Sequence, residues 1–202
     1  KCIKKFCKKN NILITIDEMQ SGFGRTGYKF LYEYYKLNPD IVCCGKGMGS
    51  GFPLSGILSS SKIMNLPNIG DMSSTHSANP LACSAGLATI DEIEAKKLVE
   101  NANKLGLVLS NKLKEFEVKF SNCISLTSSK GLIAAIIFKN VKKRKANLIA
   151  DMICKEAYNS GLLLVNTGRE SIKIGPPLTI DEINLKKALK ILEKSIKNVL
   201  NK

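Results

Sequence analysis

The sequence predicts an α/β protein. Two short apolar runs, residues 12–17 and 40–44, each lead into a polar, glycine-containing loop, as the strands of a parallel sheet do. Apolar residues recur at helical spacing in several later stretches, and further strand-like runs lie between these stretches. Hydrophobic residues make up 44% of the 202 residues and charged residues 24%, so the chain can bury a core and disorder is not expected.

The first half of the chain is expected to form a sheet with few helices. Residues 1–9 read as the end of an amphipathic helix, and one helical turn is expected around 30–35. Pro80 opens a long helical pattern that reaches Leu113, with a break near Glu100–Asn101. Strands are expected near 12–17, 40–44 and 54–58.

The second half carries four strand-like runs and two helical ones. The strands are expected at 123–127, 132–138, 162–165 and 172–174, and the helices at 145–159 and 181–200. Residues 128–131 have the length of a hairpin loop, and Gly161 suits the end of a helix. This order predicts a small α+β domain, residues 101–202, beside a larger domain, residues 1–100.

Asp17 and Lys46 are the principal candidate site residues. Each follows an apolar run, and ligands of open α/β sheets collect at the carboxyl ends of parallel strands. Four glycines lie among the seven residues 45–51, and glycine lets the backbone approach a flat ligand closely. An acid that keeps a pyridine nitrogen protonated and an amine that holds an aldehyde are what pyridoxal 5'-phosphate (PLP) requires.

Four segments of the chain resemble the class III (omega) aminotransferases, which are fold type I PLP enzymes. The segments are DEMQSGFGRTG (17–27), PDIVCCGKGMGSGFPLSG (39–56), STHSANPLA (74–82) and GPPLTI (175–180). They occur in the family's order and span nearly the whole chain. The resemblance implies that residues 1–100 are the C-terminal part of the PLP-binding large domain, with a mostly parallel sheet, and that residues 101–202 are the small C-terminal domain. Because the family's chains are much longer, it also implies that an N-terminal part precedes residue 1.

The resemblance implies a role for each candidate residue. Asp17 would pair with the pyridinium nitrogen of PLP, and Gln20 would lie near the phenolic oxygen of the ring. Lys46 would form the Schiff base with PLP and carry the proton during the reaction. Thr75 matches the family position that holds the phosphate of PLP in the neighbouring subunit, which implies a homodimer.

Simpler interpretations stay open for several residues. Thr75 and Asn79 also suit the capping of the helix that follows them, and capping is compatible with phosphate binding. Asp17 alone could end a strand and Lys46 alone could be a solvated lysine, but their surroundings argue against both. His76 is the only histidine and is assigned no role, since a metal site would need further ligands.

One position departs from the family pattern. Many members that use α-amino acids have an arginine three residues before the first proline of the Pro-Pro segment, whereas this chain has Lys173 there. Lysine offers a point charge without the bidentate fork that suits a carboxylate. Arg169 could replace it, or could be an ordinary surface residue. We therefore expect the donor to be an amine, or an amino acid held in a non-standard way.

Charge, hydropathy and cysteine content bear on nucleic-acid binding, membrane insertion, metal binding and cellular location. The formal charge of +14 comes mostly from lysines dispersed along amphipathic stretches, which favours solvated lysine over nucleic-acid binding. No apolar run is long enough to span a membrane. Seven cysteines without a Cys-x-x-Cys pair argue against a metal site and favour a reducing compartment. A cytoplasmic location is therefore expected, although a targeting signal could precede residue 1.

The sequence thus predicts PLP-dependent transamination. An amino group would pass from an amine or amino acid to PLP and then to a 2-oxo acid, and the partners are these small molecules and a second subunit. A PLP-dependent isomerase or decarboxylase on the same scaffold is one alternative. A truncated, non-catalytic binding or structural remnant is another.

Overall fold

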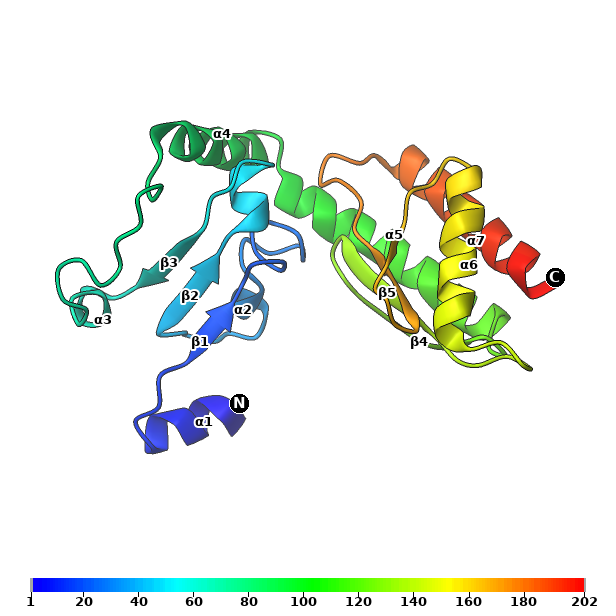
Figure 1. The fold of residues 1–202 in the computed structure, drawn as a ribbon, viewed down its shortest axis with the longest axis horizontal. Helices are drawn as coiled ribbons and strands as arrows, with labels where there is room; N and C mark the ends of the chain where they lie inside the picture. Colours follow the sequence, from blue (N-terminus) through cyan, green and yellow to red (C-terminus); the bar gives the residue numbers. More distant parts are fainter. Residues whose placement is uncertain (1, 202) are drawn as a thin grey trace. The chain divides into compact units, whose positions relative to one another are not determined.

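The computed structural model describes residues 2–201, and the chain divides into two units between Val99 and Glu100 (Figure 1). The first unit holds a three-stranded sheet and the second a four-stranded sheet. None of the helices described between residues 2 and 201 is both long and apolar enough to cross a bilayer.

The first unit is a small sheet with short helices around it. Its elements are α1 (Cys2–Lys9), β1 (Thr15–Asp17), α2 (Leu31–Tyr34), β2 (Ile41–Cys44), the 3-10 turn η1 (Lys46–Gly49), β3 (Gly56–Ser59), α3 (Ser61–Met64) and α4 (Pro80–Ala95). The strand order is β1-β2-β3, with β1 parallel to β2 and β3 antiparallel to β2. The sheet was expected to be mostly parallel, and β3 is its one antiparallel strand among the described residues. It arises because β3 returns directly after the η1 loop, whereas a second parallel strand would need a crossover.

The first unit buries few large apolar side chains. Val42 and Cys44 of β2 are buried, as are Ala82 and Ile93 of α4. A Cβ atom on Gly86 would lie 2.6 Å from the side chain of Leu54, so this glycine lets α4 pack closely on the loop after η1.

The second unit places helices on one face of an antiparallel sheet. Its elements are α5 (Leu98–Lys119), β4 (Ile124–Lys130), β5 (Ile133–Phe138), α6 (Ala146–Asn159), β6 (Val165–Asn166), β7 (Ser171–Ile174) and α7 (Glu182–Asn201), and α5 begins just before the division between the units. The strand order is β4-β5-β7-β6, and each neighbouring pair is antiparallel.

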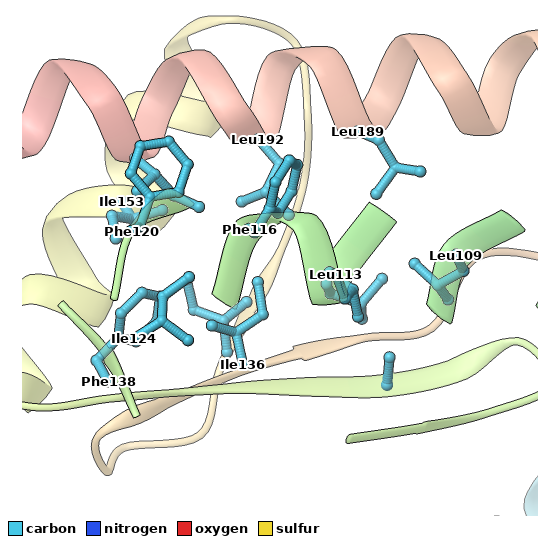
Figure 2. Close-up of a cluster of buried hydrophobic side chains, with 14 of the residues drawn as sticks. Leu109, Leu113, Phe116, Phe120, Ile124, Ile136, Phe138, Ile153, Leu189 and Leu192 are labelled. Atoms are coloured by element: carbon cyan, nitrogen blue, oxygen red, sulfur yellow. The ribbon is translucent and has the colours of Figure 1, made fainter. Parts of the chain in front are cut away.

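The main core lies between this sheet and helices α5, α6 and α7 (Figure 2). Alternate residues of β5, including Ile136 and Phe138, are buried, as the period of a half-covered strand requires. Figure 2 shows Leu113 and Phe116 of α5 pointing into the same cluster as Leu192 of α7. Burial of each such side chain contributes about 1.5–3 kcal/mol, so this cluster is the main source of stability in the second unit.

Three boundaries differ from those expected. The helical break falls at Lys97, which has a φ of 50°, and not at Glu100–Asn101. The hairpin loop is shorter than 128–131, because β4 continues to Lys130, which pairs with Ile133. Strand β6 begins later than residue 162, because the Leu162 amide still bonds to Ala157 as the last turn of α6.

We predict that Gly106→Ala destabilises the second unit by about 1–3 kcal/mol or more. A Cβ atom at this position of α5 would lie 2.5 Å from the Cα atom of Gly131, and backbone cannot rotate away from the clash. Urea unfolding measures the change. Gly175→Ala is the control, since no atom lies within 4 Å of a Cβ there. Equal unfolding midpoints for the two variants would contradict the packing described.

Candidate active site

The candidate site lies at the carboxyl ends of β1 and β2. The parallel register pairs Asp17 with Cys43, so the two strands end at the same edge of the sheet. Asp17 is the last residue of β1, and Lys46 begins the η1 turn, which Gly45 separates from the end of β2. Two residues far apart in the sequence are thus brought to one edge of one sheet.

Lys46 has an unusual backbone conformation. Its φ is 47°, in the left-handed region that residues with a Cβ atom rarely adopt, and Ser50 at the end of η1 has a φ of 46°. Such residues cost about 1–3 kcal/mol each and cluster at functional sites. The Lys46 side chain is exposed, so its amine is accessible.

The glycines on either side of Lys46 allow the loop after β1 to pack closely against the η1 turn. A Cβ atom on Gly45 would lie 2.4 Å from the sulfur of Met19, and a Cβ atom on Gly47 would lie 3.9 Å from the Cβ of Phe23. The loop that carries Gln20 therefore lies against the turn that carries Lys46. Gly45 itself has an extended backbone (φ 174°), so closeness and not a left-handed φ requires glycine there.

Asp17 and Gln20 are both exposed. The Oδ1 atom of Asp17 accepts a hydrogen bond from the Met19 amide at 2.8 Å, which fixes the carboxylate at the end of the strand. Among residues 2–201, no donor reaches the other oxygen, Oδ2. This oxygen is the one that could accept a hydrogen bond from a ligand.

Glu18, the next residue, is buried and was not among the expected site residues. Its two carboxylate oxygens accept hydrogen bonds from the Ser21 hydroxyl at 2.5 Å and from the Tyr32 amide at 2.9 Å. Its position in the sequence could have indicated this burial. Successive side chains of a strand point to opposite faces of the sheet, so the residue after the exposed Asp17 faces the other way.

Burial also affects the titration of nearby groups. Burial raises the pKa of Cys44, and the adjacent Glu18 and Cys43 raise it further, so this thiol stays protonated and packs as a small apolar group. Burial likewise raises the pKa of the Tyr32 hydroxyl and lowers that of the Arg25 guanidinium.

The structure separates the roles considered for Thr75 and Asn79. The side chain of Asn79 accepts hydrogen bonds from the amides of Leu81 and Ala82 at 3.0 and 3.3 Å and caps α4. Thr75 is exposed, lies further from the helix and has no capping contact. His76 beside it is exposed as well. The capping hypothesis is therefore confirmed for Asn79 only.

Lys173 and Arg169 belong to the second unit. Lys173 lies on β7 opposite Ala135, on the face of the sheet that points away from the core, and it is half-buried. Arg169 lies in the exposed turn between β6 and β7. Over residues 2–201, no group of three histidine, cysteine or acidic side chains is arranged to hold a metal ion.

Comparisons with known proteins identify the family of the chain. The family model for class III aminotransferases matches residues 1–196, and the chain belongs to this family of PLP-dependent enzymes. It is 35% identical over 191 residues to acetylornithine aminotransferase from Gloeobacter violaceus, which covers 95% of this chain and 46% of that protein. It is also 35% identical over 200 residues to an alanine/serine racemase from Pyrococcus horikoshii, which covers 98% of this chain and 42% of that protein.

Solved structures show the same relationship. The crystal structure of acetylornithine aminotransferase from Elizabethkingia anophelis matches with a TM-score of 0.88 and 33% identity, over 96% of this chain and 48% of that one. The chain therefore spans about half the length of the proteins that it resembles. The α/β fold and the family expected from the sequence are confirmed.

The residues present fit PLP. Asp17 offers a carboxylate oxygen that no donor of the described residues 2–201 reaches, and Lys46 offers an exposed primary amine at the same edge of the sheet. An acid and an amine are the two groups that PLP needs from a protein, one at its ring nitrogen and one at its aldehyde.

We predict that Asn79→Ala and Thr75→Ala have different effects. Loss of the cap in Asn79→Ala should lower the free energy of unfolding by about 0.5–2 kcal/mol. Thr75→Ala replaces an exposed residue without a capping contact and should change it by less than about 0.5 kcal/mol. Thermal unfolding followed by circular dichroism measures both. A larger loss of stability in Thr75→Ala would show that Thr75 supports the fold.

Proposed function

We propose that the protein is a transaminase that uses PLP to move an amino group from an amine or amino acid to a 2-oxo acid. The supporting observation is a carboxylate and an amine at the ends of two neighbouring parallel strands, in a chain of the class III family. Several relatives are named acetylornithine or ornithine aminotransferases, which favours an amino acid donor of that kind.

When bound, PLP supplies an aldehyde that reacts with primary amines and a ring that accepts electron density from the substrate. Asp17 would accept a hydrogen bond from the ring nitrogen and keep it protonated, and Gln20 would bind near the phenolic oxygen. Lys46 would hold the aldehyde until a substrate arrives. Its released amine would then carry the proton from the substrate carbon that bears nitrogen to the aldehyde carbon of PLP in the first half of the reaction, and in the opposite direction in the second half.

The proposal extends to a homodimer. The segment between α3 and α4, residues 65–79, is exposed along its whole length and carries Leu66, Ile69 and Met72, whose exposures are 75%, 107% and 63%. Exposed apolar side chains grouped in one segment are typical of a surface that a partner covers. A second copy of the chain is the proposed partner, and Thr75 in this segment would hold the phosphate of the PLP bound to that copy.

The proposal also assigns the two units to domains and the protein to a cellular compartment. We assign the unit that ends at Val99 to the PLP-binding large domain and the unit that starts at Glu100 to the small domain. A reducing, cytoplasmic location is proposed because all seven cysteines are free.

The racemase relative makes racemisation the second candidate. Both reactions would use the same acid and amine, so the geometry of Asp17 and Lys46 does not distinguish them. Transamination is preferred because most of the similar proteins are aminotransferases. A non-catalytic remnant is disfavoured, since both Asp17 and Lys46 are present and lie at one edge of the sheet. Product analysis with an amino acid, with and without a 2-oxo acid, separates transfer from racemisation.

We predict that Lys46→Ala abolishes the visible absorbance band of bound PLP and lowers the transamination rate by about 10²-fold or more. Asp17→Asn should retain the band and lower the rate. The protein expressed from its full coding sequence is titrated with PLP, and circular dichroism confirms folding. Lys62→Ala, at an exposed lysine of α3, is the matched control. A band that persists unchanged in Lys46→Ala would refute the proposed function.

We predict that Lys173→Ala raises the KM for carboxylate-bearing substrates about tenfold or more, because a charged hydrogen bond contributes about 1.5–3 kcal/mol. Steady-state kinetics across amines and amino acids measures the effect, and amines without a carboxylate should show no change. Arg169→Ala and the exposed Lys145→Ala serve as comparisons. An unchanged KM for every carboxylate substrate would exclude Lys173 from the site.

A further inference from the structure

Glu18 is an acidic residue whose side chain is almost completely buried, with an exposed fraction of 1%. Burying a carboxylate is costly unless hydrogen bonds replace those lost from water. The positions of its two donors show what this buried carboxylate does for the site.

The two donors lie at opposite ends of one loop. Ser21, near the start of the loop that joins β1 to α2, donates its hydroxyl to Oε2 at 2.5 Å. Tyr32, at the start of α2, donates its amide to Oε1 at 2.9 Å. One side chain therefore holds both ends of the loop that contains Gln20.

The backbone of Glu18 links this loop to the sheet. Its amide donates to the carbonyl of Cys43 at 2.9 Å, which continues the pairing of β1 with β2 by one residue. Its carbonyl accepts from the Gly22 amide at 3.0 Å. The position of the loop is thus set relative to both strands that end at the site.

The loop is packed tightly around these contacts. A Cβ atom on Gly22 would lie 2.9 Å from the Glu18 carbonyl oxygen, and the buried Thr26 hydroxyl donates to the Ser21 carbonyl at 3.1 Å. Phe23 has a φ of 54° and lies beside Gly47 of the η1 turn. A displacement of the loop would therefore be transmitted to the turn that carries Lys46.

We propose that Glu18 is a positioning residue for the PLP site: its buried carboxylate holds the loop with Gln20, and through that loop the η1 turn, in the geometry that binds the cofactor. Glu18 acts through Ser21 and Tyr32 and does not touch PLP. The inference rests on the proposed function, and it is tested by measurements with and without PLP.

Three variants test the role of the carboxylate. Glu18→Ala removes both acceptors and should weaken PLP binding at least tenfold. Glu18→Gln should stay within about threefold of the wild type, because the amide oxygen can accept from the Tyr32 amide while the amide nitrogen donates to the Ser21 hydroxyl. Ser21→Ala removes one of the two hydrogen bonds, and its PLP affinity should lie between those of Glu18→Ala and Glu18→Gln. Glu33→Ala, which removes the exposed acid beside Tyr32, is the matched control and should bind PLP as the wild type does.

The measurements separate positioning from a general loss of stability. PLP affinity is determined by absorbance titration at a temperature at which circular dichroism shows each variant to be folded. In the protein without PLP, hydrogen exchange at the Gly22 and Tyr32 amides should be faster in Glu18→Ala and Ser21→Ala, but not in Glu18→Gln. If Glu18→Ala does not fold, Ser21→Ala carries the test.

Several outcomes would overturn the proposal. Unchanged PLP affinity in a folded Glu18→Ala, or unchanged exchange in the loop, would show that the carboxylate does not position the site. Equal losses of PLP affinity in Glu18→Gln and Glu18→Ala would show that the negative charge of Glu18, and not its hydrogen bonds to the loop, supports PLP binding. Failure of the wild type to bind PLP would refute the proposed function, whereas the exchange measurements would still report on the role of Glu18 in the loop.

Discussion

The parallel pairing of β1 with β2 is the constraint on which the candidate site depends. The register that places Asp17 opposite Cys43 makes both strands end at the same edge, and each candidate group follows directly from one strand end. A register shifted by one residue would turn Asp17 to the other face of the sheet. The pairing of the two strands therefore brings Asp17 and Lys46 to one edge of the sheet, and the loops after the strands set the local positions of Gln20 and Lys46.

The loops after the two strands contain the least favourable local conformations of the site. Lys46 and Phe23 adopt left-handed φ values, and Glu18 is a carboxylate removed from water. These features persist because neighbouring contacts compensate for them, namely the hydrogen bonds to Glu18 and the close packing beside Gly45. The backbone strain thus lies in the unit where the chemistry is proposed, whereas the large apolar core lies in the other unit.

The boundaries of helices and strands were predicted most accurately where the local sequence pattern is strongest. Helices α6 and α7 were expected within a residue or two of their ends, because their apolar period and the glycine after α6 are strong signals. The break before α5 was misplaced, since a left-handed lysine such as Lys97 has no signature in the sequence. The extension of β4 through two serines was missed, because polar residues of an edge strand look like a loop.

The sequence by itself determined the family, the α/β class and the two groups expected to hold PLP, because these follow from residue types at particular spacings. Only the tertiary structure decided that Asn79 caps α4 while Thr75 stays exposed, and that Glu18 is buried between Ser21 and Tyr32. The reason is physical. The Tyr32 amide that binds Glu18 lies 14 residues further along the chain, and burial depends on which segments meet, which a single sequence does not state. Even for local contacts, the sequence allows Thr75 and Asn79 alike to cap α4, and only the folded backbone places the Asn79 side chain against the Leu81 and Ala82 amides.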